Sequence, residues 1–166
     1  MFKESKNPIV AELTKSHKRR SINLATLRAI VVELPDHKAE RRCAWCTENK
    51  LNHGNQKYCS TLCSQSAMAW AYPQKEEALY FLLERQNWKC FDCQFQYVKP
   101  TTSSSPHFLI KRFKKTIAPE RKPEVDHTIP ISKDGTALGL SNHTILCFTC
   151  HKKKTKIDNS GPRKKK

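Results

Sequence analysis

The feature that most constrains this chain is the spacing of its eight cysteines, which fall in four close pairs. Two cysteines separated by two residues suit a shared metal ion better than a strained local disulfide, although an even count also permits four disulfides. A redox Cys-x-x-Cys motif would need a thioredoxin-like pattern, which four pairs do not resemble. We therefore predict two structural zinc sites, one formed by Cys43, Cys46, Cys59 and Cys63, and one by Cys90, Cys93, Cys147 and Cys150.

A thin supply of core residues supports this prediction. Only 37% of the 166 residues are hydrophobic, so we expect metal ions to supplement apolar burial. The longest apolar runs are far too short to cross a bilayer, and the first residues lack the apolar stretch of a secretory signal. These observations argue against a membrane protein and an exported protein, and they predict an intracellular, cytoplasmic location in association with DNA.

The charge of the chain predicts a polyanionic partner. It has 31 Lys and Arg against 15 Asp and Glu, a formal net charge of +16. Eight zinc-bound thiolates add −8 and two zinc ions +4, which still leaves +12. Such an imbalance is larger than solubility alone requires, so we expect nucleic acid, with duplex DNA as the first candidate.

The chain divides into a basic N-terminal helical region (1–72) that contains a zinc module (43–66), a second domain (73–159) and a disordered basic tail (160–166). Ser21 can cap a helix that ends near Leu34, although the β-branched residues in this stretch leave a strand open. The cluster Lys18-Arg19-Arg20 suits either phosphate contact or a solvated face.

Local patterns predict two further helices and two loops. One helix begins near Cys59 and continues toward Met68, and an amphipathic helix covers residues 73–86. Residues 101–106 have the composition of a flexible loop, and the basic residues 111–122 are a candidate DNA-facing segment. We assign His53 to a loop rather than to a metal, because four cysteines already complete a tetrahedron.

Residues 124–156 concentrate the candidate chemistry. They predict a short strand, a polar loop, a second strand and a Lys-rich helix. Asp126 and His151 would form an open ligand set for a divalent ion, and His127 is suited to act as a general base near neutral pH. Neighbouring strand residues point to opposite faces, so Asp126 and His127 share one cleft only if the strand ends, twists or bulges there, or if the metal lies to one side of the attacking water.

Three groups of residues make a resemblance specific: Asp126-His127-x-x-Pro130, Asn142, and Cys147-x-x-Cys150-His151-x-x-Lys154-Thr155. Together with the stretch from Arg85 to Cys93, they resemble the HNH endonuclease family of ββα-metal fold, in its zinc-bearing four-cysteine branch. The resemblance covers residues 78–158.

The resemblance implies a small α+β protein, in which a ββα-metal nuclease unit is held by a four-cysteine zinc site and preceded by the helical second zinc module. It also implies that His127 is the general base, that Asp126 and His151 hold the catalytic divalent metal (Mg²⁺, Mn²⁺, Ni²⁺ or Zn²⁺), and that Asn142 braces the loop and orients His127. His143 stands where a leucine is common in the family, so it either replaces a packing residue or competes for metal.

The predicted function is therefore metal-dependent hydrolysis of DNA phosphodiester bonds. The alternative is a non-catalytic, zinc-dependent nucleic-acid-binding protein. Cutting of both strands with one active site per chain would favour a homodimer.

Overall fold

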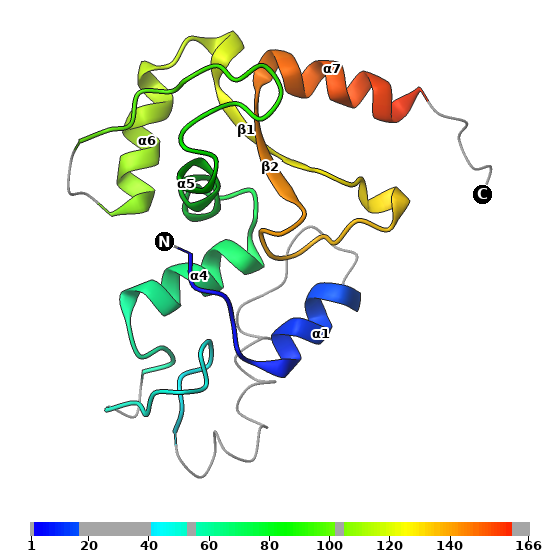
Figure 1. Ribbon diagram of the computed structural model, residues 1–166. Helices are drawn as coiled ribbons and strands as arrows, with labels where there is room; N and C mark the ends of the chain where they lie inside the picture. The colour runs from blue at the N-terminus through cyan, green and yellow to red at the C-terminus, as the bar shows by residue number, and fades with distance from the viewer. Residues whose placement is uncertain (1, 17–40, 53–55, 102–104, 161–166) are drawn as a thin grey trace.

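The computed structural model describes residues 2–16, 41–52, 56–101 and 105–160. In these residues the chain forms five α-helices, two 3-10 helices (η1 and η2) and one two-stranded sheet (Figure 1). The expected small α+β fold is confirmed. The helix expected from Ser21, the cluster Lys18-Arg19-Arg20, His53 and the tail residues 161–166 lie outside the described residues. The elements are α1 (Pro8–Ser16), α4 (Thr61–Ala71), α5 (Glu76–Arg85), α6 (Pro106–Thr116), η1 (Pro119–Arg121), β1 (Pro123–His127), η2 (Ile131–Lys133), β2 (His143–Cys147) and α7 (Phe148–Asn159).

Helix α5 forms the centre of the larger hydrophobic core and lies between α6 and the sheet (Figure 1). Ala78 and Leu82, like Leu79 and Leu83, are four residues apart, so each pair lies on one side of the helix. All four side chains are buried. Glu76 and its neighbour Glu77 occupy the first turn, where the helix dipole favours carboxylates. The helix expected over residues 73–86 is therefore present, with a later start.

Helix α6 begins with Pro106, whose fixed φ suits the first position of a helix. It buries Leu109, Ile110 and Phe113 and packs against α5. Between these apolar positions the side chains of Lys111 and its neighbour Arg112 are exposed. The basic segment 111–122 thus includes the second half of this helix, and its contact with DNA stays a prediction.

Strands β1 and β2 form an antiparallel pair, with Asp126 opposite Thr144 and His127 opposite His143. The side chain of Gln86, just after α5, accepts a hydrogen bond from the Ile145 N–H (2.7 Å) and donates one to the Ile145 carbonyl (3.2 Å). These bonds cover the open edge of β2, which two strands alone would leave unpaired. The sheet is thereby attached to α5.

Helix α7 packs on this sheet with little apolar contact. Of its twelve residues only Cys150 is buried. Short helices owe most of their stability to tertiary packing. The position of α7 therefore depends on its cysteine and on its polar contacts.

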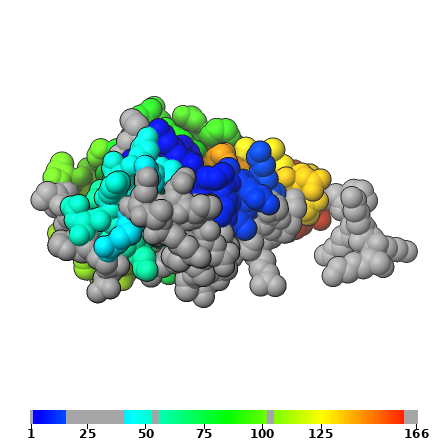
Figure 2. Space-filling model, turned by 90° about the horizontal axis from the view of Figure 1, so that it is seen from below, coloured from blue at the N-terminus to red at the C-terminus, as the bar shows by residue number. Residues whose placement is uncertain are grey.

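A second core joins α1, α4 and the cysteine module that precedes α4. Its centre contains Trp45 and Trp70, whose ring centroids lie 6.0 Å apart. Viewed from below, α1 (blue) lies on the same face of the molecule as the cysteine module (cyan) (Figure 2). Ala69 of α4 belongs to the larger core while Trp70 belongs to the second, so α4 contributes to both. The domain boundary expected after residue 72 stays a prediction.

Candidate active site and zinc centres

The cluster of Cys90, Cys93, Cys147 and Cys150 places one sulfur atom from each residue within 4.8 Å of the others. The Sγ atoms of Cys93 and Cys147 lie 3.8 Å apart. A zinc ion with four Zn–S bonds of about 2.3 Å requires sulfur separations near 3.8 Å, whereas a disulfide requires about 2.05 Å. The arrangement therefore fits a four-cysteine zinc site that fastens α7 to the knuckle at residues 90–93.

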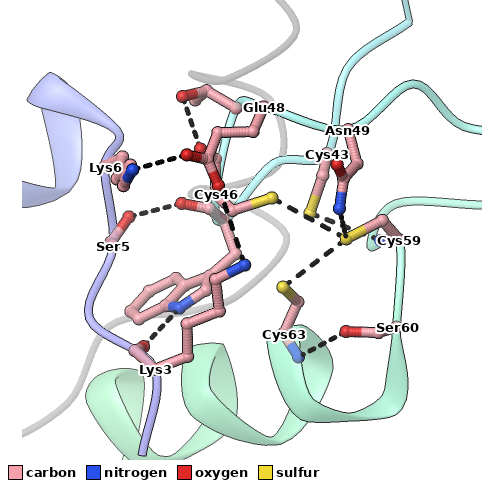
Figure 3. Close-up of polar contacts among 12 residues, drawn as sticks. Lys3, Ser5, Lys6, Cys43, Cys46, Glu48, Asn49, Cys59, Ser60 and Cys63 are labelled. Atoms are coloured by element: carbon pink, nitrogen blue, oxygen red, sulfur yellow. Dashed lines mark hydrogen bonds and ion pairs between the residues drawn. The ribbon is translucent and has the colours of Figure 1, made fainter.

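The second cluster, Cys43, Cys46, Cys59 and Cys63, has the same geometry (Figure 3). The Cys59 Sγ lies 3.7 Å from the Cys46 Sγ and 3.6 Å from the Cys63 Sγ. Helix α4 is capped by Ser60, whose hydroxyl accepts a hydrogen bond from the Cys63 N–H at 3.2 Å. The expected helix after Cys59 is confirmed, and this cluster also fits a zinc ion.

Residues 2–7 wrap around this cysteine module (Figure 3). The Trp45 indole N–H donates to the Lys3 carbonyl, and the Ser5 hydroxyl donates to the Trp45 carbonyl, each at 2.7 Å. Lys6 forms an ion pair with Glu48. The N-terminal segment is thus part of the module.

The loop between β1 and β2 is anchored in the second core. Leu138 is completely buried in the second core, and the Gly139 N–H donates to the Trp70 carbonyl at 3.1 Å. Gly139 has φ +75°, and an added Cβ there would lie 3.2 Å from the Trp70 ring. A glycine suits both the left-handed backbone and the close approach. The second core, to which the cysteine module contributes, therefore supports the loop that precedes Asn142.

Asn142 holds the other side of this loop. Its Oδ1 accepts a hydrogen bond from the Ile129 N–H (2.8 Å), and its Nδ2 donates to the carbonyls of Ile129 (2.8 Å) and Thr136 (3.0 Å). A Cβ added at Gly135 would lie 1.9 Å from the Ile129 carbonyl oxygen and 2.7 Å from the Asn142 Nδ2. Gly135 is thus required by the close packing around this amide.

His127 is the last residue of β1 and is buried against His143, with ring centroids 4.4 Å apart. Burial and the adjacent His127 lower the pKa of His143 to about 3. His143 is therefore a neutral packing partner near pH 7. Of the two readings that the sequence left open for His143, packing is the one that its position favours.

Asp126 and His151 face each other from β1 and α7. The Asp126 Oδ1 lies 3.9 Å from the His151 Nε2. Two donors about 2.1 Å from one ion can be no more than about 4.2 Å apart, so this pair fits a shared divalent ion. In the described part of the chain, no third His, Cys, Asp or Glu lies within 4.8 Å of both donor atoms. The pair would leave most of the ion's coordination positions open.

Glu124 and Lys154 complete the polar surroundings of this pair. The other ring nitrogen of His151, Nδ1, forms a short contact with the Glu124 carboxylate. The Lys154 ammonium lies 2.9 Å from the Asp126 Oδ2 and 2.6 Å from the Asp158 carboxylate. A carboxylate on the second nitrogen of a histidine fixes the orientation of the ring, as it does for many metal ligands.

A cavity of about 460 Å³ lies between β1, the loop and α7. Its wall includes Asp126, His127, His151 and Lys154. Asp126 and His127 both line it although they are neighbours on β1, whose last residue is His127.

Residues 111–156 match the model of the HNH endonuclease family. This segment is HNH-like. The resemblance expected from the sequence is confirmed here, over less than a third of the chain. Searches of curated proteins and of solved structures found no match.

The HNH-like segment contains the hairpin, the loop and most of α7, including Asp126, His127, Asn142 and His151. Cys90 and the other knuckle cysteine precede it, so the zinc site links the segment to the preceding part of the chain. None of the helices in the described residues is long and apolar enough to span a membrane.

Three residues around this site, Glu124, Lys154 and Arg85, had no role predicted from the sequence. Glu124 precedes Asp126 by two positions, which puts both on one face of a strand. Lys154 follows His151 by three positions, which puts both on one side of a helix. The Arg85 guanidinium donates to the Leu140 carbonyl at 2.8 Å and to the His143 carbonyl. The spacings of Glu124 and Lys154 are visible in the sequence and could have indicated their positions. The contact of Arg85 depends on the tertiary fold and could not.

Proposed function

We propose that this protein is a metal-dependent endonuclease that hydrolyses phosphodiester bonds in DNA. The observation that carries the proposal is the single cavity that joins His127 to the Asp126–His151 pair. The HNH-like segment supports nuclease chemistry, and the net charge of +16 supports a nucleic-acid substrate.

In this proposal His127 is the general base. A ring nitrogen of His127 takes a proton from water, and the oxygen of that water attacks phosphorus in line as the bond to the 3′ oxygen breaks. The leaving 3′ oxygen takes a proton from solvent, so the products carry a 5′-phosphate and a 3′-hydroxyl. Proton abstraction by a positioned base typically contributes about 10²–10⁴-fold to the rate. Neutral His143 packs against His127 and adds no competing positive charge.

Asp126 and His151 would hold the divalent metal. When bound, such an ion supplies stabilisation of the negative charge that develops on the phosphate and the leaving oxygen. Glu124 orients the His151 ring, and Asn142 holds the chain that follows His127. Both are positioning residues in this proposal.

We further propose that duplex DNA inside the cell is the substrate, and that cutting of both strands requires two copies of the chain. The alternative, a non-catalytic zinc-dependent nucleic-acid-binding protein, has the same basic surface. This alternative does not explain why Asp126, His127 and His151 all line one cavity. The two hypotheses differ in one measurable property, the cleavage of DNA.

The test is incubation of supercoiled plasmid with zinc-loaded protein and added Mg²⁺, Mn²⁺ or Ni²⁺. We expect nicked or linear DNA with the wild type, and its loss with His127→Ala, while DNA affinity stays within a few-fold. His107→Ala is the matched control, because His107 is a partly exposed histidine on α6 that does not line the candidate catalytic cavity.

Two results would contradict the proposal. Cleavage at the wild-type rate by purified His127→Ala would exclude His127 as the base. Intact plasmid under all three metals, together with tight and salt-sensitive DNA binding, would favour the non-catalytic alternative.

A further inference from the structure

A second cavity, of about 330 Å³, lies against a different face of α7 from the candidate catalytic cavity. One wall is a single face of α7 with Cys150, Lys153, Lys154 and Ile157, which follow a helical repeat. The rest of its lining includes Thr144 and Leu146 of β2 and two residues of the zinc knuckle, Phe91 and Asp92. The cavity is therefore built from the three parts that the cluster of Cys90, Cys93, Cys147 and Cys150 joins.

The cavity combines an apolar interior with an exposed apolar rim. Phe91 is 60% exposed and Ile157 is 71% exposed, and both line it. Large apolar side chains that are exposed together at the edge of a cavity indicate a binding surface. Neither Phe91 nor Ile157 belongs to one of the two hydrophobic cores of the described structure.

The charges around the cavity indicate what enters it. Lys153 and Lys154 line it, and α7 also carries Lys152 and Lys156. The carboxylate of Asp92 is part of the lining, which disfavours a phosphate inside. Apolar walls inside and lysines at the edge suit a group that is itself aromatic and is attached to an anionic backbone.

The two cavities are close enough to be used by one nucleic-acid strand. Lys154 lines both of them. Asp126 in the catalytic cavity and Thr144 in the second are directly paired across the sheet. Paired residues of antiparallel strands have Cα atoms about 4.5–5.5 Å apart, so the linings of the two cavities meet at this pair.

We propose that this second cavity binds an unstacked base of the nucleic-acid strand whose phosphate lies at the Asp126–His151 pair, with Phe91 as the stacking surface. The proposal rests on the proposed nuclease function and adds to it a base-binding subsite next to the reacting phosphate. Stacking of a base on an aromatic side chain needs no base-specific hydrogen bond and tolerates any sequence. The subsite would thus favour substrates in which a base near the cut leaves the stack easily.

The test compares binding of two single-stranded 12-mers, one of ordinary deoxynucleotides and one in which every base is replaced by an abasic spacer. The phosphates are the same, so only the bases differ. The protein is the zinc-loaded full chain with His127→Ala, which keeps the DNA intact, and affinity is measured by fluorescence anisotropy at one salt concentration. Phe91→Ala is compared with Phe108→Ala, an aromatic residue of similar exposure (64%) on α6.

We expect Phe91→Ala to weaken binding of the ordinary 12-mer by about 5- to 100-fold and to leave binding of the abasic 12-mer unchanged. Phe108→Ala should change neither affinity. Equal weakening of both 12-mers by Phe91→Ala would indicate general damage to the surface and overturn the proposal, as would no weakening of either. These results do not depend on cleavage, whereas failure of the plasmid assay with the wild type would overturn the nuclease function alone.

Discussion

The side-chain amide of Asn142 pairs with the backbone of Ile129 through two hydrogen bonds, both of 2.8 Å. In addition, the Asn142 backbone carbonyl accepts a hydrogen bond from the Thr128 N–H at 2.8 Å. Thr128 and its neighbour Ile129 directly follow His127, the last residue of β1. Asn142, the residue before β2, thus holds the chain immediately beyond the proposed base. These hydrogen bonds give a physical basis for the bracing role expected of Asn142.

Replacement of Asn142 by Ala should lower both stability and activity. The variant leaves the N–H and the carbonyl of Ile129 without their side-chain partner, at a cost of about 1–3 kcal/mol in the free energy of unfolding. We expect cleavage to fall at least tenfold under conditions in which the variant is fully folded, as judged by urea unfolding. Ser141→Ala, at an exposed neighbouring position, is the control. A wild-type rate in folded Asn142→Ala would restrict the amide to a folding role.

Replacement of Glu124 by Gln should weaken the binding of the divalent metal. The neutral amide retains the size of the side chain but removes the negative charge next to the His151 Nδ1. Loss of such an orienting carboxylate typically costs about 10- to 100-fold in metal affinity or activity.

The measurement for Glu124→Gln is the Mn²⁺ concentration at half-maximal cleavage, which should rise while the rate at saturating Mn²⁺ changes less. Glu120→Gln is the matched control, because Glu120 is exposed on η1 and lies four residues before Glu124. The same shift in both variants would show a general effect of charge and exclude a specific role of Glu124.

The sequence was most informative where a pattern is local. The cysteine pairs, the amphipathic repeat before Gln86 and the order of strand, loop, strand and helix after Glu124 all appear in the structure as expected. Each pattern needs only the period of one element or the spacing of one motif. In the structure Cys147 is the last residue of β2, and Cys150 lies in the first turn of α7.

The contacts that depend on tertiary packing were not predictable in this way. The insertion of Leu138 into the second core joins residues far apart in the sequence, and no spacing rule indicates it. The sequence alone leaves three roles open for the cysteine module, namely reading DNA, dimerisation and bracing of the N-terminal helix. The burial of Leu138 and the bond from Gly139 to Trp70 indicate a further role, in which the core that contains the module supports the loop.

Replacement of Leu138 by Ala should therefore destabilise the second core and also lower the activity of the candidate active site. Leu138 is completely buried, and truncation of a buried leucine to alanine costs about 2–5 kcal/mol. We compare it with Leu51→Ala, which is also in the second core but not in the loop. After correction for the folded fraction from thermal unfolding, cleavage should fall several-fold more with Leu138→Ala. Equal loss in the two variants would argue against support of the loop by the module.

Replacement of His143 by Leu should reduce the sensitivity of the fold to acid. Burial first, and then the neighbouring His127, lower the pKa of His143 to about 3 in the folded protein, against about 6.5 in the unfolded chain. Arg85 also disfavours the charged ring, whereas Asp126 favours it. Between these pH values the unfolded chain binds a proton at this site that the folded protein does not. The free energy of unfolding therefore falls as the pH falls below about 6.5.

The measurement for His143→Leu is the free energy of unfolding at pH 7.5 and at pH 5.5. The wild type should lose about 1 kcal/mol more than the variant over this interval. The zinc thiolates are common to both proteins, so their own acid sensitivity cancels in the comparison. Identical losses would show that the folded protein accommodates a protonated His143.

Removal of the zinc ion at Cys150 should release α7 without unfolding the whole chain. Cys150 is the only buried residue of α7, so the helix has no apolar face to hold it once the thiolate site is lost. We expect Cys150→Ser to bind one zinc ion fewer and to exchange the α7 amides at least 100-fold faster, as measured by hydrogen exchange with mass spectrometry. Cys63→Ser removes a ligand from the other cluster and is the matched control.

Because α7 carries His151 and Lys154 to the candidate catalytic cavity, its release should abolish cleavage. Full protection of α7 in Cys150→Ser, with one zinc ion lost, would show that the ion pairs to Glu124 and Asp126 hold the helix by themselves.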